Sequence, residues 1–68
     1  ATLHRRTVRP DGRVGLGAHD LRLGAAYAGQ HITLLVNGPC VVFHALDGQP
    51  LGHLTLDPHQ RYARMDAA

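Results

Sequence analysis

The fold is decided by the stretch from His31 to Leu56, which reads HITLLV-NGP-CVVFHAL-DG-QPLGHLTL. It contains three β-rich, largely apolar runs, and turn-forming residues separate each run from the next. Apolar runs of this length between Asn-Gly and Asp-Gly dipeptides are typical of antiparallel strands joined by hairpin turns. The stretch therefore predicts a three-stranded β-meander.

The two turns in this meander differ. Asp47-Gly48 suits a two-residue loop, because both loop positions need φ > 0. The register that follows pairs Leu46 with Gln49, His44 with Leu51, and Val42 with His53. A two-residue loop at Asn37-Gly38 would need the N–H of residue 39, which Pro39 lacks, so we expect a longer or bulged connection there.

Alternation along the first two runs predicts which side chains face the core. Ile32, Leu34 and Val36 share one side of the first strand, and Val41, Phe43 and Ala45 share one side of the second. The residues predicted to be buried in the core are Val8, Val14, Leu16, Leu23, Ile32, Leu34, Val41 and Phe43. The opposite faces also carry apolar residues, such as Leu35 and Val42. Strands that are apolar on both sides fit a small closed barrel better than a flat sheet with one wet face.

The N-terminal part is expected to supply the remaining strands. Arg5–Arg9 and Arg13–Gly17 are short alternating runs on either side of Pro10-Asp11-Gly12, which suits a three-residue hairpin loop with a bulge. The predicted register places Val8 opposite Val14 and Arg9 opposite Arg13. Like charges directly across a ladder are unfavourable, so the Arg9–Arg13 pair needs an explanation. Three interpretations are open: Asp11 partly offsets the two charges, the pair binds a phosphate, or both side chains point apart into water.

The rest of the chain gives weaker signals. Leu21–Leu23 predicts a brief strand, and 24–29 a loop or tight turn in which Tyr27 closes the barrel or stacks on a nucleotide. Asp57 and Pro58 begin a segment that forms a turn of helix or a frayed tail. The sequence thus predicts an all-β barrel of about five antiparallel strands at 5–56, after a lead-in at 1–4 and before a C-terminal tail at 57–68.

Length and composition limit the possibilities further. The 68 residues form one small domain, and the single cysteine, Cys40, excludes an internal disulfide or a Cys-x-x-Cys zinc site. There is no apolar run of the roughly 18 residues that a membrane-spanning helix needs, and the arginine-rich start lacks the apolar segment expected of a signal peptide. We therefore expect a cytoplasmic protein with no membrane partner.

The charge is distributed unevenly. All seven basic residues are arginines and all five acidic residues are aspartates. Residues 1–22 contain five arginines against Asp11 and Asp20, which gives this part a net charge of +3. Positive charge gathered at one end favours a polyanionic partner, whereas the simpler interpretation is an ordinary solvated surface.

Nothing in the sequence indicates catalysis. Serine is absent, Cys40 lies in an apolar strand, and there is no glycine-rich phosphate-binding motif or pair of carboxylates at a useful spacing. His44 and His53 could be diagonal neighbours across a hairpin, but no third ligand accompanies them. We expect no enzymatic activity, no metal and no cofactor.

Several motifs together carry a resemblance to a known family. They are Arg6-Thr7-Val8, Asp11-Gly12-Arg13-Val14, Leu16-Gly17, Leu23-Gly24, and Tyr27-Ala28-Gly29-Gln30 followed by Ile32-Thr33-Leu34. Over roughly residues 5–56 the chain resembles the small C-terminal β-barrel of bacterial insertion-sequence DDE transposases and integrases, which are relatives of retroviral integrases. The resemblance implies an SH3-like barrel that binds DNA with little sequence preference and helps assemble the transposition complex. The family's catalytic residues belong to a separate core domain, so no aspartate here is expected to be catalytic.

The resemblance and the charge together suggest a site and partners. Arg5, Arg6, Arg9, Arg13 and Arg22 are expected to contact phosphates, because the planar guanidinium meets two phosphate oxygens at once, and Arg64 in the tail is expected to contribute much less. The implied partners are the DNA backbone and the protein's own catalytic core domain or other transposase protomers. The alternative is an oligomerisation or interdomain-docking module with no direct DNA contact. Asp20 and the alanines before Tyr27 favour that alternative.

Overall fold

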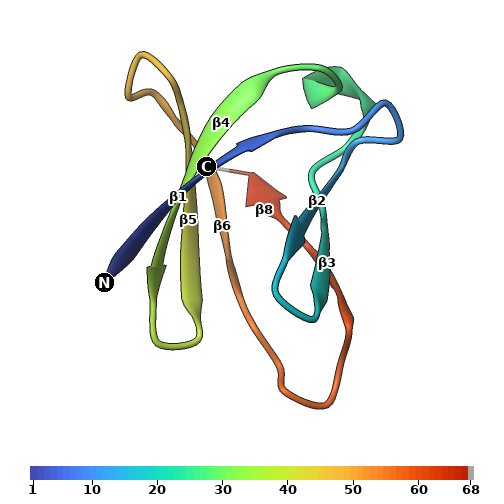
Figure 1. The fold of residues 1–68 in the computed structure, drawn as a ribbon, viewed down its shortest axis with the longest axis vertical. Helices are drawn as coiled ribbons and strands as arrows, with labels where there is room; N and C mark the ends of the chain where they lie inside the picture. The colour runs from blue at the N-terminus through green and yellow to red at the C-terminus, as the bar shows by residue number, and fades with distance from the viewer. Residues whose placement is uncertain (68) are drawn as a thin grey trace.

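The computed structural model describes residues 1–67, which form two β-sheets (Figure 1). The larger sheet has the order β1-β4-β5-β6-β8, and its strands are Thr2–Thr7, His31–Asn37, Cys40–Ala45, Pro50–Thr55 and Asp66–Ala67. The smaller sheet has the order β2-β3-β7, with strands Arg13–Leu16, His19–Arg22 and Tyr62–Arg64. The predicted all-β class is confirmed. Within residues 1–67, however, no single ladder closes the strands into one barrel.

Helical structure is minimal. The one helical segment among residues 1–67 is the 3₁₀ turn η1, Ala25–Tyr27. It is far too short to cross a membrane. This turn matches the tight turn predicted for residues 24–29. Tyr27 is half-buried and packs against the core, as expected for a side chain that closes one end of it.

The two sheets are joined where the chain passes from one to the other. The backbone of Val8 exchanges hydrogen bonds with Gln30 and Gly29, both 2.9 Å long, and so continues the pairing of β1 with β4. The next residue, Arg9, instead donates its N–H to the carbonyl of Arg13, 2.9 Å away. A second crossing lies at Met65, between β7 in one sheet and β8 in the other, and its N–H donates to the Arg22 carbonyl.

The core lies between the two sheets. It consists of the buried side chains of Val8, Val14, Leu16, Leu21, Ile32, Leu34, Val41, Phe43, Leu54 and Met65. The predicted inward faces of β4 and β5 are confirmed, although Val36 and Ala45 at their ends are only half-buried. The predicted burial of Leu23 is wrong, because the alternation buries Leu21 of β3 instead, and Leu23 is only half-buried against the core.

The β5–β6 turn corrects part of the predicted register. Val42 pairs with His53 as predicted, but a shift between Phe43 and His44 places His44 opposite Pro50 instead of Leu51. The loop has three residues, because Ala45 donates its N–H to the Gln49 carbonyl and Leu46 stays unpaired with Gln49. The Asp47 carboxylate accepts the Gln49 N–H at 3.0 Å, and Gly48 with φ 90° takes the bulge position of a three-residue hairpin.

The β4–β5 turn is shorter than expected. Asn37 pairs with Cys40, so the loop is Gly38-Pro39, and the prediction of a longer connection is wrong. Gly38 has φ 58°, which suits the first position of a type II′ turn. Pro39 takes the second loop position, whose N–H the ladder does not use, so its missing donor costs nothing.

The N-terminal hairpin forms only at its tip. The loop Pro10-Asp11-Gly12 is present as predicted, with the Gly12 N–H bonded to the Arg9 carbonyl at 2.8 Å. Beyond Arg9 and Arg13 the predicted pairing is wrong, because β1 pairs with β4 while β2 pairs with β3. The cause lies partly at Gly12, whose carbonyl accepts the N–H groups of Leu23 and Gly24 and holds the tip beside the end of β3.

Strands lie near both ends of the described residues, 1–67. β1 begins at Thr2, so most of the predicted lead-in is strand. Asp57 forms a turn in which its carbonyl accepts the Gln60 N–H at 3.0 Å, and the chain then enters β7, which runs parallel to β3. Residues 57–67 are therefore neither a helix nor a frayed tail. The side chains of this segment alternate between core and solvent as in a strand, since Ala63 and Met65 face the core.

A test of the crossing at Met65 uses Gly52 of β6. A Cβ at Gly52 would meet the Asp66 carbonyl oxygen and the Met65 side chain, whereas a Cβ at Gly15 meets nothing within 4 Å. We expect Gly52→Ala to lower the free energy of unfolding by about 1–3 kcal/mol, because the C-terminal strands must move away. Urea denaturation followed by circular dichroism measures this loss. Gly15→Ala is the matched control, and equal stability of the two variants would contradict the described packing of β8.

Candidate functional site

Three arginines occupy neighbouring positions across the smaller sheet. Arg13 of β2 pairs with Arg22 of β3, which in turn pairs with Arg64 of β7. Their chain neighbours Val14 and Leu21 are buried, so alternation directs the arginines to the outer face. We call Arg13, Arg22 and Arg64 the arginine row. Since paired positions on adjacent strands lie about 5 Å apart, the row is about 10 Å long.

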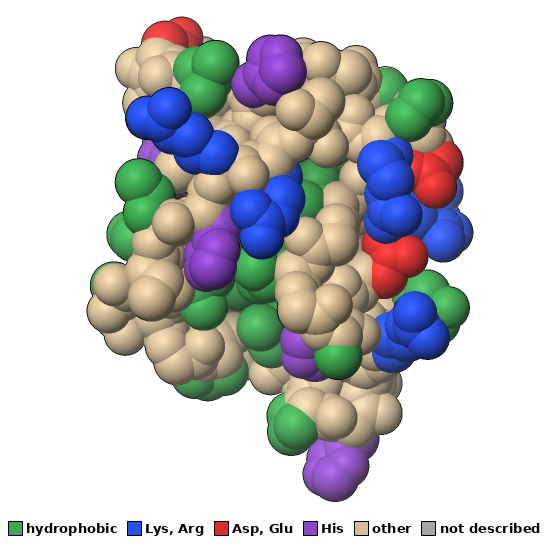
Figure 2. Space-filling view, in the orientation of Figure 1, with side chains coloured by type: hydrophobic (Ala, Val, Ile, Leu, Met, Phe, Trp, Pro, Cys, Tyr) green, Lys and Arg blue, Asp and Glu red, His purple; other side chains and the backbone are tan. Residues whose placement is uncertain are grey.

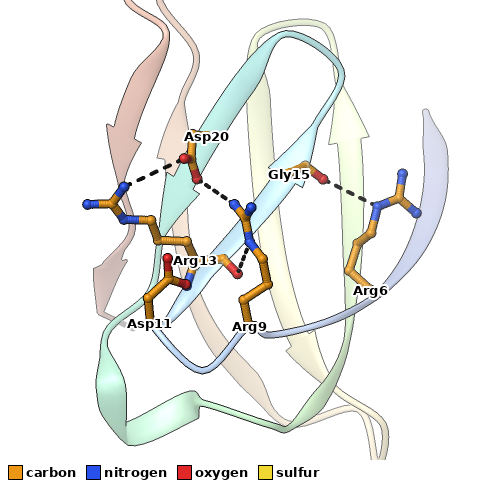
Figure 3. Close-up of polar contacts among 6 residues, drawn as sticks. All are labelled: Arg6, Arg9, Asp11, Arg13, Gly15 and Asp20. Atoms are coloured by element: carbon orange, nitrogen blue, oxygen red, sulfur yellow. Dashed lines mark hydrogen bonds and ion pairs between the residues drawn. The ribbon is translucent and has the colours of Figure 1, made fainter.

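Asp20 is the counter-ion at one end of this row. Its Oδ1 accepts a hydrogen bond from Arg9 Nη2 at 3.0 Å, and its Oδ2 lies 3.8 Å from Arg13 Nη1 (Figure 3). Asp11, which the sequence suggested as the offsetting charge, instead accepts the backbone N–H of Arg13 at 3.2 Å. Asp20 on the next strand, not Asp11 in the loop, therefore offsets the charges of Arg9 and Arg13.

The other two members of the row have no such partner. Within residues 1–67, the guanidinium groups of Arg22 and Arg64 make no ion pair and no side-chain hydrogen bond. Both residues are exposed. Like charges in directly opposed positions destabilise a sheet. The row is thus an unfavourable arrangement in the free protein, which a bound anion would relieve.

A cavity of about 600 Å³ opens beside the row. On its β8 side, β6 pairs only at Gly52 and His53, and the next residues, Leu54 and Thr55, line the cavity. Its remaining lining comes from Asp20, Gln60, Tyr62, Ala63, Asp66 and the arginine row. In the view of Figure 2, arginine side chains gather on the side of β2 and β3, with acidic side chains among them. We call this cavity the groove.

The two remaining predicted arginines lie elsewhere. Arg6 reaches from β1 to the Gly15 carbonyl, with its Nε 3.3 Å from that oxygen (Figure 3). Arg5 is exposed on the larger sheet, where it pairs with Thr33. Of the five predicted residues, the structure thus brings together Arg9, Arg13 and Arg22.

The structure places Arg64 differently from the sequence-based prediction. The sequence predicts a C-terminal tail at this position, whereas Arg64 lies in β7 and completes the row beside Arg22. The signal that could have found it is the alternation of Tyr62, Ala63, Arg64 and Met65, in which polar and apolar side chains take turns. That period of two indicates a strand, and a strand directs Tyr62 and Arg64 to the same face.

The histidines and the cysteine form no comparable cluster. Among residues 1–67, no group of three or more His, Cys, Asp or Glu side chains is placed to hold a metal ion. Cys40, at the start of β5, is exposed beside the β4–β5 turn.

Comparison with known proteins adds no assignment. No family model, curated protein or solved structure matches this chain. Its function must therefore be inferred from the charges and geometry of its own residues.

Charge repulsion within the arginine row should lower the free energy of unfolding, which can be measured. Arg22→Gln keeps a long polar side chain but removes the central charge, so we expect it to raise the free energy of unfolding by about 0.2–1 kcal/mol at low salt. The gain should shrink near 1 M salt, where the Debye length is only about 3 Å. Arg5→Gln is the matched control, since Arg5 faces Thr33 and not another arginine. A loss of stability in Arg22→Gln at low salt would contradict repulsion within the row.

Proposed function

We propose that this chain is a non-catalytic domain that binds the DNA phosphate backbone with little sequence preference. The observation that carries the proposal is the arginine row, in which Arg22 and Arg64 make no side-chain hydrogen bond or ion pair within residues 1–67 and Arg13 shares one carboxylate with Arg9. Exposed guanidinium groups in a line match a polyanion with regularly spaced charges. The resemblance to the C-terminal barrel of insertion-sequence transposases and integrases supports the same function.

The chemistry of the row suits phosphate groups. Each guanidinium offers parallel N–H donors that bind two phosphate oxygens at once. A row about 10 Å long can meet two or three successive phosphates of one strand, whose charges are about 3.4 Å apart along the duplex axis. Contacts of this kind position a protein on DNA without reading its bases.

The proposed role within a larger protein follows from this mode of binding. In a transposase or integrase, a separate catalytic core would cut and join the DNA, and this domain would hold flanking DNA and help assemble the transposition complex. Backbone contacts suit such a role, because flanking DNA differs from one target to the next.

The salt dependence of DNA binding tests the proposal. Each phosphate contact contributes about −0.9 to the slope of log affinity against log salt concentration. We therefore expect Arg22→Ala with Arg64→Ala to make the slope for a random-sequence duplex less steep by about 1.8, measured by fluorescence anisotropy. Arg5→Ala with Arg6→Ala removes the same charge from β1 and should have a smaller effect. The same pair also tests the sequence-based expectation that those two arginines contact phosphates.

Two results would reject the proposal. One is a row variant that binds duplex as tightly as the wild type at every salt concentration. The other is a wild-type protein with no measurable affinity for DNA at low salt. Circular dichroism of each variant ensures that the compared proteins are folded.

A second candidate function is protein–protein docking through the larger sheet. Its outer face carries the cross-strand row Leu3, Leu35 and Val42, in which Leu3 is 62% exposed and Leu35 38% exposed. β1 is also an edge strand within residues 1–67, so its outer backbone groups can pair with another strand. These features support association with a second protomer, with no direct DNA contact.

Sedimentation tests this second candidate. If the outer face docks a second copy, the wild type should form a dimer at micromolar concentration, and Leu35→Ser should dissociate it by removing the central apolar contact. Leu46→Ser, at an exposed hairpin loop, is the control and should leave the dimer intact. A wild type that stays monomeric throughout this range would reject self-association.

A further inference from the structure

An exposed aromatic ring lies beside the arginine row. Tyr62 is 63% exposed and lines the groove, whereas the other tyrosine, Tyr27, is half-buried against the core. Tyr62 pairs with Asp20 and lies two residues before Arg64 on the same face of β7. Exposure of this degree leaves the ring with little part in core packing.

The ring is anchored on a fixed segment of backbone. Arg61 donates no side-chain hydrogen bond within residues 1–67, but its guanidinium carbon lies 5.9 Å from the centre of the Tyr62 ring, within the range of a cation–π interaction. The Arg61 carbonyl accepts the Asp20 N–H at 2.7 Å, which fixes the entry into β7. Tyr62 is therefore an accessible ring on a strand held beside the row.

We propose that the groove binds an unpaired nucleotide of a DNA strand, with the base stacked on Tyr62 and the neighbouring phosphates on the arginine row. Thr55 and Gln60 also line the groove and offer hydroxyl and amide groups to the edge of the base. A volume of about 600 Å³ is within the range of about 300–1,000 Å³ found for small-ligand sites. This inference rests on the proposed DNA binding and names its preferred substrate, which is DNA with unpaired bases.

Physical reasons favour an unpaired base over a duplex. Within a duplex both faces of each base are covered by neighbouring bases, so a tyrosine ring has no free face to contact. Stacking on an exposed ring also accepts any base, because every base has a π-face. A stacking site beside a phosphate-binding row therefore keeps the low sequence preference of the proposed function while adding a preference for strand ends or gaps.

The test compares strands that differ only in their bases. Binding of labelled oligothymidylate, an abasic strand of equal length and a duplex is measured by fluorescence anisotropy. We expect Tyr62→Ala to weaken binding of oligothymidylate by roughly 5- to 150-fold, the usual range for loss of one stacked base, and to leave the abasic strand unaffected. Tyr62→Phe keeps the ring and should bind like the wild type. Leu46→Ala is the matched control, because Leu46 is 63% exposed like Tyr62 but lies in the β5–β6 loop outside the groove.

Tyrosine emission provides an independent readout. The chain has two tyrosines and no tryptophan, so in Tyr27→Phe the only strong emitter is Tyr62. We expect oligothymidylate to quench this emission by stacking, and the abasic strand to bind without comparable quenching. Competition with thymidine monophosphate separates a strand site from a pocket for free nucleotides, and equal competition by the monophosphate would overturn the assignment to a strand.

The outcomes separate this inference from the proposed function. Equal affinity of the wild type for the thymidine and abasic strands, or no effect of Tyr62→Ala, would overturn the stacking site while leaving backbone binding in place. Failure of every strand and of the duplex to bind would reject the proposed function and the stacking site with it.

Discussion

The fold depends on the division of backbone hydrogen bonds between two adjacent residues. Val8 bonds to Gln30 and Gly29 in one sheet, and Arg9 bonds to Arg13 in the other. A chain of this length buries only about 60% of the surface that its unfolded state exposes, so neither sheet could be stable alone. Passing the chain from sheet to sheet at this point, and again at Met65, lets both sheets cover the same core.

A close backbone approach keeps this arrangement in place. The Gly12 carbonyl accepts the N–H groups of Leu23 and Gly24, and a Cβ on Gly12 would collide with the Gly24 carbonyl group. Gly12 also has φ 79°, a conformation that other residues adopt at a cost. The tip of the N-terminal hairpin is thereby held against the segment after β3, and β2 pairs with β3 rather than with β1. The arginine row and Asp20 are placed by the same pairing.

Local patterns in the sequence predict the faces of the central strands and the N-terminal loop, but not the lengths of the β4–β5 and β5–β6 loops. The inward faces of β4 and β5 follow from alternation, and the loop before Arg13 follows from its turn residues. Strand pairing was harder to predict, because Val8 is buried whether β1 lies beside β2 or beside β4. The same limit applies to the site. Arg13, Arg22 and Arg64 are brought together by a parallel pairing of β3 with β7, and no local pattern encodes a contact between distant segments.

The position of Arg64 in the row has a consequence for how the domain acquires its proposed binding surface. Arg22 and Arg64 are 42 positions apart in the chain, and their strands pair in parallel. Closing such a large loop costs conformational entropy before the contact between the two strands contributes any stability. Contacts of this kind therefore slow folding. A partly synthesised or partly folded chain thus carries its arginines scattered. The proposed surface for an anionic partner therefore arises only with the completed fold, and affinity for such a partner would report on folding itself.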